Sequence, residues 1–142
     1  MRILILNGPN LNKLGDRRED HYGSLTLSKI EESIRYEFPK DEFFFFQSNL
    51  EGKLVTYIQN SENEYDGLII NPGGYTHTSV AIKDALEIIK IPKIEVHLSN
   101  LSGREEYRQK LLTTSSCNGY ISGFKENGYL AAIYLLKKIL TK

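Results

Sequence analysis

The sequence predicts a doubly wound α/β fold, in which helices cover both faces of a five-stranded parallel sheet. Five short apolar or aromatic runs alternate with amphipathic helical patterns along the 142 residues. Several of the runs are apolar nearly throughout, which is typical of strands covered on both faces. Polar residues follow four of the runs, as expected where a ligand binds beyond the carboxyl ends of parallel strands.

The predicted strands have four or five residues each. They are Ile3–Asn7, Phe43–Gln47, Gly67–Asn71, Ile94–Leu98 and Tyr120–Gly123. Strands that alternate with helices pair in parallel through crossover connections. Five such strands suit the flavodoxin-like order 2-1-3-4-5.

Four predicted helices lie between and after the strands, with apolar residues three and four positions apart. The patterns are Leu27, Ile30, Ile34 and Phe38; a weaker set of Leu54, Val55 and Ile58; Val80, Ala81, Ala85, Leu86 and Ile89; and Tyr129, Ala132, Ile133, Leu136 and Leu140. Ser102-Gly103-Arg104-Glu105 matches a capping box and predicts a short helix in the fourth crossover.

Length predicts one domain over residues 1–142, and the composition is that of an ordinary globular protein. The formal net charge of zero argues against a nucleic-acid surface, which normally carries a basic excess. No apolar run approaches the ~20 residues of a membrane span, and the N-terminal run is too short for a signal peptide. We therefore expect a cytoplasmic protein. The single cysteine, Cys117, is expected to be a small buried side chain.

The segment Asn7–Gly23 is the most unusual part of the chain. It is a long polar stretch between the first predicted strand and the first predicted helix, and it is bracketed by glycines. Loops of this length inside a compact domain are uncommon and usually functional or disordered. We predict that this segment, called the flap below, covers an active site.

Polar clusters follow the first four predicted strands. They are Asn7-Gly8-Pro9-Asn10, Gln47-Ser48-Asn49, the stretch from Asn71 to His77, and His97-Leu98-Ser99-Asn100. These clusters are rich in neutral hydrogen-bonding groups and poor in carboxylates, which favours a polyhydroxylated, anionic small molecule as ligand. Asn10 is as compatible with a structural turn as with a site. No G-x-G-x-x-G or Walker sequence is present.

Two histidines follow strand ends. His77 and Asp84 are seven residues apart on an expected helix, which would place them on one face. His77 near a helix N-terminus is expected to be neutral. Glu95 lies two residues before His97 on the same strand face, where it would fix the tautomer of the imidazole and favour its protonated form. That pairing favours a general acid, although a lone histidine there is more often structural. Three histidines without clustered carboxylates predict no metal site.

Tyr22 and Arg17 lie five residues apart in the flap. A phenol has an ordinary pKa of ~10, so a tyrosine base needs a nearby cation to stabilise its anion near neutral pH. The flap therefore carries a candidate base and a candidate activator. A half-buried aromatic with no chemical role is the alternative for Tyr22.

Taken together, these motifs resemble the type II 3-dehydroquinate dehydratases of the shikimate pathway along essentially the whole chain. The motifs are Asn7-Gly8-Pro9-Asn10-Leu11-Asn12-x-Leu14-Gly15-x-Arg17, Tyr22-Gly23, Gln47-Ser48-Asn49-x-Glu51-Gly52, Asn71-Pro72-Gly73-Gly74-Tyr75-Thr76-His77-Thr78-Ser79, Glu95-Val96-His97-x-Ser99-Asn100 and Arg104-Glu105-x-x-Arg108. The resemblance implies dehydration of 3-dehydroquinate to 3-dehydroshikimate by anti elimination through an enolate.

The resemblance also implies roles for the catalytic residues. Tyr22 would remove a proton from C2, and Arg17 would keep Tyr22 ionised. Asn10 would stabilise the enolate through a bound water. His97 would protonate the departing C1 hydroxyl, and Glu95 would orient His97.

Substrate binding is implied for a second set of residues. Asn71, His77 and Arg108 would bind the ring hydroxyls and the carboxylate region. The backbone N–H groups of Leu98 and Ser99 would hold the carboxylate.

The implied assembly is a homododecamer built as a tetramer of trimers, in which Asp84 would reach the site of a neighbouring subunit. No metal, cofactor or Schiff-base lysine is implied. The sequence departs from the family in its flap, which reads Arg17-Arg18-Glu19 without the usual proline, and at Leu50, where a histidine is common. Because Arg18 is also a cation, either arginine could activate Tyr22, although the spacing from Gly15 favours Arg17.

Two other functions remain open from the residues. The chain could be a flavodoxin-like module that binds a flavin or nucleotide without catalysis, although it lacks a phosphate loop. The polar strand ends could also be turns only, but that interpretation leaves the flap with its paired arginines and tyrosine unexplained.

Overall fold

A computed structural model describes residues 1–142 and has one five-stranded, all-parallel sheet in the order β2-β1-β3-β4-β5. The predicted fold class and strand order are confirmed. The strands are β1 (Arg2–Asn7), β2 (Glu42–Gln47), β3 (Gly67–Asn71), β4 (Lys93–His97) and β5 (Gly119–Ser122). Each lies within one residue of its predicted bounds.

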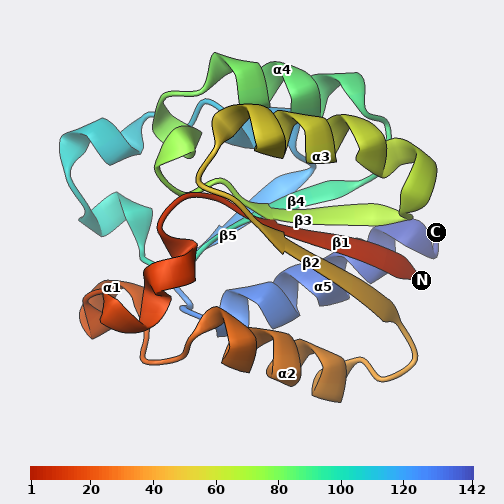
Figure 1. The fold of residues 1–142 in the computed structure, drawn as a ribbon, viewed down its shortest axis with the longest axis horizontal. Coiled ribbons are helices and arrows are strands. Elements are labelled where there is room, and N and C mark those ends of the chain that lie inside the picture. The colour runs from red at the N-terminus through yellow and green to blue at the C-terminus, as the bar shows by residue number, and fades with distance from the viewer.

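Helices cover both faces of the sheet (Figure 1). The helices are α2 (Leu27–Glu37), α3 (Glu51–Glu64), α4 (Val80–Ile88) and α5 (Asn127–Leu140). Helices α3 and α4 lie on one face, and α2 and α5 lie on the other. Helix α3 is longer than the weak periodic pattern indicated, and it begins directly after Leu50.

Side chains that alternate along β1 divide the core into two clusters. Ile3 and Ile5 pack with the α2 and α5 side of the sheet, and Leu4 and Leu6 pack with the α3 and α4 side. All four are 0% exposed. Each fully buried aliphatic side chain of this size contributes about 1.5–3 kcal/mol through removal from water, so β1 anchors both halves of the molecule.

The flap contains two short helices, although a polar loop was predicted. The 3-10 helix η1 (Leu11–Asp16) follows β1, and the single helical turn α1 (Glu19–Tyr22) follows η1. Leu11 and Leu14 are buried in the core, which holds η1 against the sheet. The flap lies at the carboxyl ends of the strands, beside the segment that follows β4 (Figure 1).

The predicted capping box does not form. The segment after β4 contains two 3-10 helices, η3 (Leu101–Gly103) and η4 (Glu106–Gln109). Ser102 Oγ donates to Asn100 Oδ1 at 2.8 Å, and Glu105 accepts from Arg108 Nε at 2.6 Å. Both side chains are therefore bound elsewhere and cap no helix.

His77 and Asp84 do not share a helix, contrary to the prediction. His77 ends the 3-10 helix η2 (Gly73–His77), and Ser79 starts α4 separately by accepting from the backbone N–H of Ile82 at 3.0 Å. Thr78 between them has non-helical φ and ψ angles.

No helix is long and apolar enough to cross a membrane.

Cys117 is half-buried beside the second core cluster rather than fully buried. Burial raises the pKa of its thiol to about 12, so the thiol stays protonated near neutral pH.

Candidate active site

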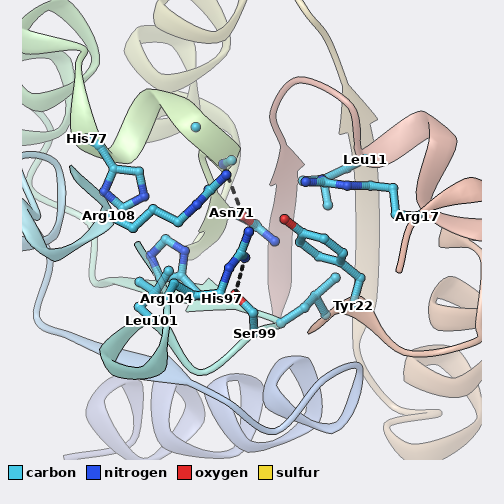
Figure 2. Close-up of a pocket in the computed structure, with 13 residues that line it drawn as sticks. Leu11, Arg17, Tyr22, Asn71, His77, His97, Ser99, Leu101, Arg104 and Arg108 are labelled. Carbon is cyan, nitrogen blue, oxygen red and sulfur yellow. Dashed lines mark hydrogen bonds between the residues drawn. The ribbon is translucent and has the colours of Figure 1, made fainter. Parts of the chain in front are cut away.

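A pocket lies between the flap and the carboxyl ends of β3 and β4 (Figure 2). Its wall includes most of the predicted site residues together with several others. The lining residues are Leu11, Arg17, Tyr22, Asn71, Gly73, Gly74, His77, His97, Leu98, Ser99, Leu101, Arg104 and Arg108. Three of them are arginines and none is an aspartate or glutamate, so the pocket wall is cationic.

The turns that follow β1 and β3 contact each other at Asn71, one of the residues that line the pocket. The backbone N–H of Gly8, just after β1, donates to the carbonyl of Asn71 at the end of β3, with a distance of 2.8 Å. A Cβ atom at position 8 would lie 2.3 Å from the carbonyl oxygen of Pro72. Because that oxygen belongs to the backbone and cannot rotate away, only glycine permits this approach.

The flap contributes Tyr22 and Arg17, which enter the pocket from the side opposite the two histidines (Figure 2). The guanidinium carbon of Arg17 lies 3.6 Å from the centroid of the Tyr22 ring, so the cation stacks on the ring face. Burial lowers the pKa of Arg17, and its attraction to Tyr22 opposes that effect. An arginine remains charged under such a shift.

Arg18 binds Asp20 instead of Tyr22. Its Nε and Nη2 atoms donate to the two carboxylate oxygens of Asp20, at 3.1 and 2.5 Å. Its side chain is 73% exposed, and it does not line the pocket. Of the two flap arginines, Arg17 is the one in contact with Tyr22.

His97 and Glu95 form a buried pair on β4. His97 Nε2 lies 2.7 Å from Glu95 Oε2, with side chains 5% and 0% exposed. Because a carboxylate accepts hydrogen bonds, the imidazole donates through Nε2. Nδ1 is then the nitrogen that remains for a ligand.

In His77 the other ring nitrogen, Nδ1, is the one bound to the protein. Its Nδ1 lies 2.8 Å from the carbonyl oxygen of Lys110, which can only accept, so Nδ1 carries a proton. Burial is the main cause that lowers the pKa of His77, and the carbonyl of Lys110 opposes it. A neutral His77 presents Nε2 as an acceptor, as expected for a group that binds a hydroxyl.

Asn71 is held by a network at the end of β3. Its Oδ1 accepts from the backbone N–H of Gly73 at 3.1 Å, and its Nδ2 donates to the buried hydroxyl of Tyr129 at 3.3 Å. Tyr129 in turn donates to Asn7 Oδ1 at 2.5 Å. The Asn71 amide is therefore fixed within the pocket wall, where it is 4% exposed.

The cationic side of the pocket comes from the segment after β4. Arg108 Nε donates to Glu105 Oε2; this bond lowers the pKa of the exposed Glu105 and, against the effect of burial, raises that of Arg108. Arg104 Nη1 donates to Ser99 Oγ at 2.9 Å, and its guanidinium carbon lies 5.3 Å from the Tyr22 ring centroid. Figure 2 shows both arginines on the side of the two histidines.

Three predicted site residues lie outside the pocket wall. Glu95 lies behind His97. Asn10 is exposed, adopts a left-handed conformation with φ 69° and starts η1. Asp84 is exposed on α4. The sequence reasoning missed Arg104, Leu11 and Leu101, and the spacing of Arg104 four residues before Arg108 was the available signal for the first.

No group of three or more His, Cys, Asp or Glu side chains is arranged to hold a metal ion. The pocket instead offers an aromatic hydroxyl, two imidazoles, an amide and three guanidinium groups. Such a set can move protons and bind a hydroxylated anion.

Comparisons with known proteins identify the family of this chain. The family model described as dehydroquinase class II matches residues 1–137. A 3-dehydroquinate dehydratase of Clostridium perfringens is 48% identical over 141 residues, with 97% of each chain covered.

Two solved structures are also similar. A type II dehydroquinase from Butyrivibrio crossotus is 43% identical with a TM-score of 0.93, covering 96% of this chain and 97% of its own. A type II dehydroquinase from Propionibacterium acnes is 32% identical with a TM-score of 0.89, covering 96% of both chains. The chain therefore belongs to the class II dehydroquinase family.

Proposed function

We propose that this chain, by its family a 3-dehydroquinate dehydratase, removes water from its substrate with Tyr22 as the base and His97 as the acid. The observation that carries the proposal is the position of these two side chains, on opposite sides of one cationic pocket. A substrate between them can lose a proton on one side and a hydroxyl on the other. The family relation favours this lyase over a flavin- or nucleotide-binding module.

The first step forms an enolate. The Tyr22 phenolate takes a proton from C2 of 3-dehydroquinate, and the electron pair of the broken C–H bond moves onto the C3 carbonyl oxygen. Arg17, stacked on the ring 3.6 Å from its centroid, favours the phenolate over the phenol. The expected role of Asn10, to stabilise the enolate through a bound water, stays a prediction.

The second step expels water. The enolate re-forms the C3 carbonyl, C1 and C2 become doubly bonded, and the C1 hydroxyl leaves as His97 protonates it. His97 uses Nδ1 for this step because Nε2 is bound to Glu95. Removal from C2 on one side and departure from C1 on the other is an anti elimination, and its product is 3-dehydroshikimate.

The remaining groups bind the substrate. Arg108 and the backbone N–H groups of Leu98 and Ser99 hold the carboxylate, which suits a pocket wall with three arginines. His77, neutral and with Nε2 free, accepts from a ring hydroxyl, and Asn71 donates to another through its fixed amide.

Substitution of each proton-transfer group tests the proposal. Tyr22→Phe and His97→Ala should each lose about 10²–10⁴-fold in kcat, the usual contribution of a general acid or base, and should still bind the product. The measurement is the absorbance of the conjugated enone product, with product affinity from calorimetry. Near-normal turnover of Tyr22→Phe would rule out this base, and near-normal turnover of His97→Ala would rule out this acid.

We further propose a homododecamer, a tetramer of trimers, in which Asp84 acts at a neighbouring subunit's site. The exposure of Asp84 on α4, outside its own pocket, is compatible with that role. Light scattering should give about twelve times the 16.3 kDa chain mass. A monomeric enzyme with full activity would contradict both the assembly and the role of Asp84.

A further inference from the structure

The segment Lys110–Thr114 lies behind the pocket wall, where it hydrogen-bonds His77 directly and the carboxylate of Glu95, the partner of His97. It follows η4 and leads into η5 (Thr114–Ser116), and none of its residues lines the pocket. The carbonyl of Lys110 fixes the tautomer of His77. The hydroxyls of Thr113 and Thr114 contact the carboxylate that binds His97.

Glu95 needs these contacts because it is fully removed from water. Its side chain is 0% exposed, and a buried carboxylate is costly unless hydrogen-bond donors surround it. Thr113 Oγ1 donates to Glu95 Oε1 at 2.5 Å, and Thr114 Oγ1 donates to Oε2. With His97, the carboxylate has three donors from three side chains.

Backbone hydrogen bonds hold Thr113 and Thr114 beside the Glu95 carboxylate. The N–H groups of Leu112 and Thr113 donate to the carbonyl of Thr76, at 2.9 and 3.4 Å. Thr76 is 0% exposed and lies next to His77 in η2. The Lys110–Thr114 segment is therefore attached to η2 beside His77. From there it hydrogen-bonds both His77 and the carboxylate that binds His97.

We propose that Thr113 and Thr114 are positioning residues for the proton that His97 delivers. Their hydroxyls hold the Glu95 carboxylate in place, so that Glu95 binds His97 Nε2–H and leaves Nδ1 directed at the leaving hydroxyl. This inference rests on the proposed role of His97 as the acid. Neither threonine touches the substrate, and both act through Glu95.

The charges around His97 make this support necessary. His77 faces it from η2, and Arg104 and Arg108 line the same pocket from the segment after β4. The guanidinium groups carry the same charge as an imidazolium. Glu95 is the carboxylate hydrogen-bonded to His97. A Glu95 side chain that moved away would leave His97 facing these cationic groups without its carboxylate partner.

The test replaces each hydroxyl by a methyl group of similar shape. Thr113→Val and Thr114→Val should each lower kcat by on the order of 10-fold, and the basic limb of the pH–rate profile should move to lower pH. KM should stay within about twofold, because substrate contacts are unchanged. Thr113→Ser and Thr114→Ser, which retain the hydroxyl, should restore both kcat and the pH profile.

Ser115→Ala is the matched control, because this exposed neighbour donates to the carbonyl of Leu112 and not to Glu95. It should leave kcat and the pH profile unchanged. If Thr113→Val fails to fold, Thr114→Val decides the question, because Thr114 is only half-buried.

Two results would overturn the inference. One is a wild-type kcat and pH profile in the valine variants. The other is a loss of kcat that the serine variants do not restore. If His97→Ala is inactive and the valine variants are unaffected, only this inference is overturned. If His97→Ala is active, the proposed role of His97 as the acid is overturned.

Discussion

Arg17 and Arg18 are adjacent in sequence and differ completely in surroundings. Arg17 stacks on Tyr22 inside the pocket, while Arg18 is occupied by both carboxylate oxygens of Asp20 at the surface. Composition cannot distinguish them, because both are arginines in one flap. The distinction depends on the three-dimensional contacts of each side chain, with Tyr22 for Arg17 and with Asp20 for Arg18.

Replacement of Arg17 should therefore affect catalysis, whereas replacement of Arg18 should not. In Arg17→Ala the phenolate of Tyr22 loses its neighbouring cation, so a higher pH is needed to form it and the acidic limb of the pH–rate profile should move upward. Arg18→Ala is the matched control and should keep the wild-type profile. A shift in Arg18→Ala with none in Arg17→Ala would reverse the assignment.

Gly23 is the residue at which the flap turns back toward α2. Its φ of 84° and ψ of 178° belong to a region that only glycine adopts readily. A Cβ atom there would also lie 2.5 Å from Glu126 Oε2. Tyr22 directly precedes Gly23, so this turn determines where the candidate base lies.

Gly23→Ala should consequently move Tyr22. We expect kcat to fall about 10-fold or more, because backbone strain of ~1–3 kcal/mol would favour an open flap. Gly52→Ala, in the exposed first turn of α3 with no atom within 4 Å of its added Cβ, is the matched control and should have normal activity. Equal activity of the two variants would contradict a flap fixed at Gly23.

At the scale of elements, the flap is also tied to the loop before α5. Lys125 Nζ donates to the carbonyl of Asp20 at 2.7 Å, and Lys125 itself has a φ of 50°. The loop before α5 therefore helps to hold α1 in place, although the two lie more than 100 residues apart in sequence. No local pattern in the sequence predicts such a contact.

The sequence predicts the sheet well because its signals are local and repeated. Apolar runs define β1 to β5, and periodic apolar positions define α2, α4 and α5. The short helices η1 and α1 were missed because six and four residues are too few for periodicity to appear. Ser102 and Glu105 have the spacing of a capping box, but tertiary partners take both side chains.

Only some of the pocket residues were predicted, because only some of them lie at strand ends. Residues at strand ends, such as Asn71 and His97, converge whenever the strands are parallel, so topology alone brings them together. Leu101 and Arg104 reach the pocket from the start and the end of η3, a 3-10 helix too short to show a periodic pattern in the sequence.

At the scale of the whole molecule, Asp41 joins both ends of the chain to the sheet. Its Oδ1 accepts from the N-terminal ammonium of Met1 at 3.1 Å, and its Oδ2 accepts from Lys137 Nζ near the end of α5. The side chain is 6% exposed. Burial opposes ionisation, but the hydrogen bonds from these two cations outweigh it and lower the pKa of Asp41.

Asp41→Asn should lower the free energy of unfolding by about 1–3 kcal/mol at pH 7. Because the folded-state pKa lies below the ordinary value of 3.8, the wild-type contribution is complete above pH 3.8 and is lost as pH falls through the folded value. The difference between the two proteins should thus shrink in acid. Urea unfolding from pH 7 to pH 3 measures it, and Glu37→Gln, at an exposed carboxylate without partners, should show no such difference.

The most direct test of a tyrosinate base opposite an imidazole acid is exchange of the C2 hydrogen of 3-dehydroquinate with D₂O, followed by NMR. Only the first step is needed for exchange, so His97→Ala should exchange this hydrogen while it forms little product. Tyr22→Phe should do neither above the enzyme-free rate. Exchange that persists in Tyr22→Phe, or disappears only in His97→Ala, would contradict the assigned roles.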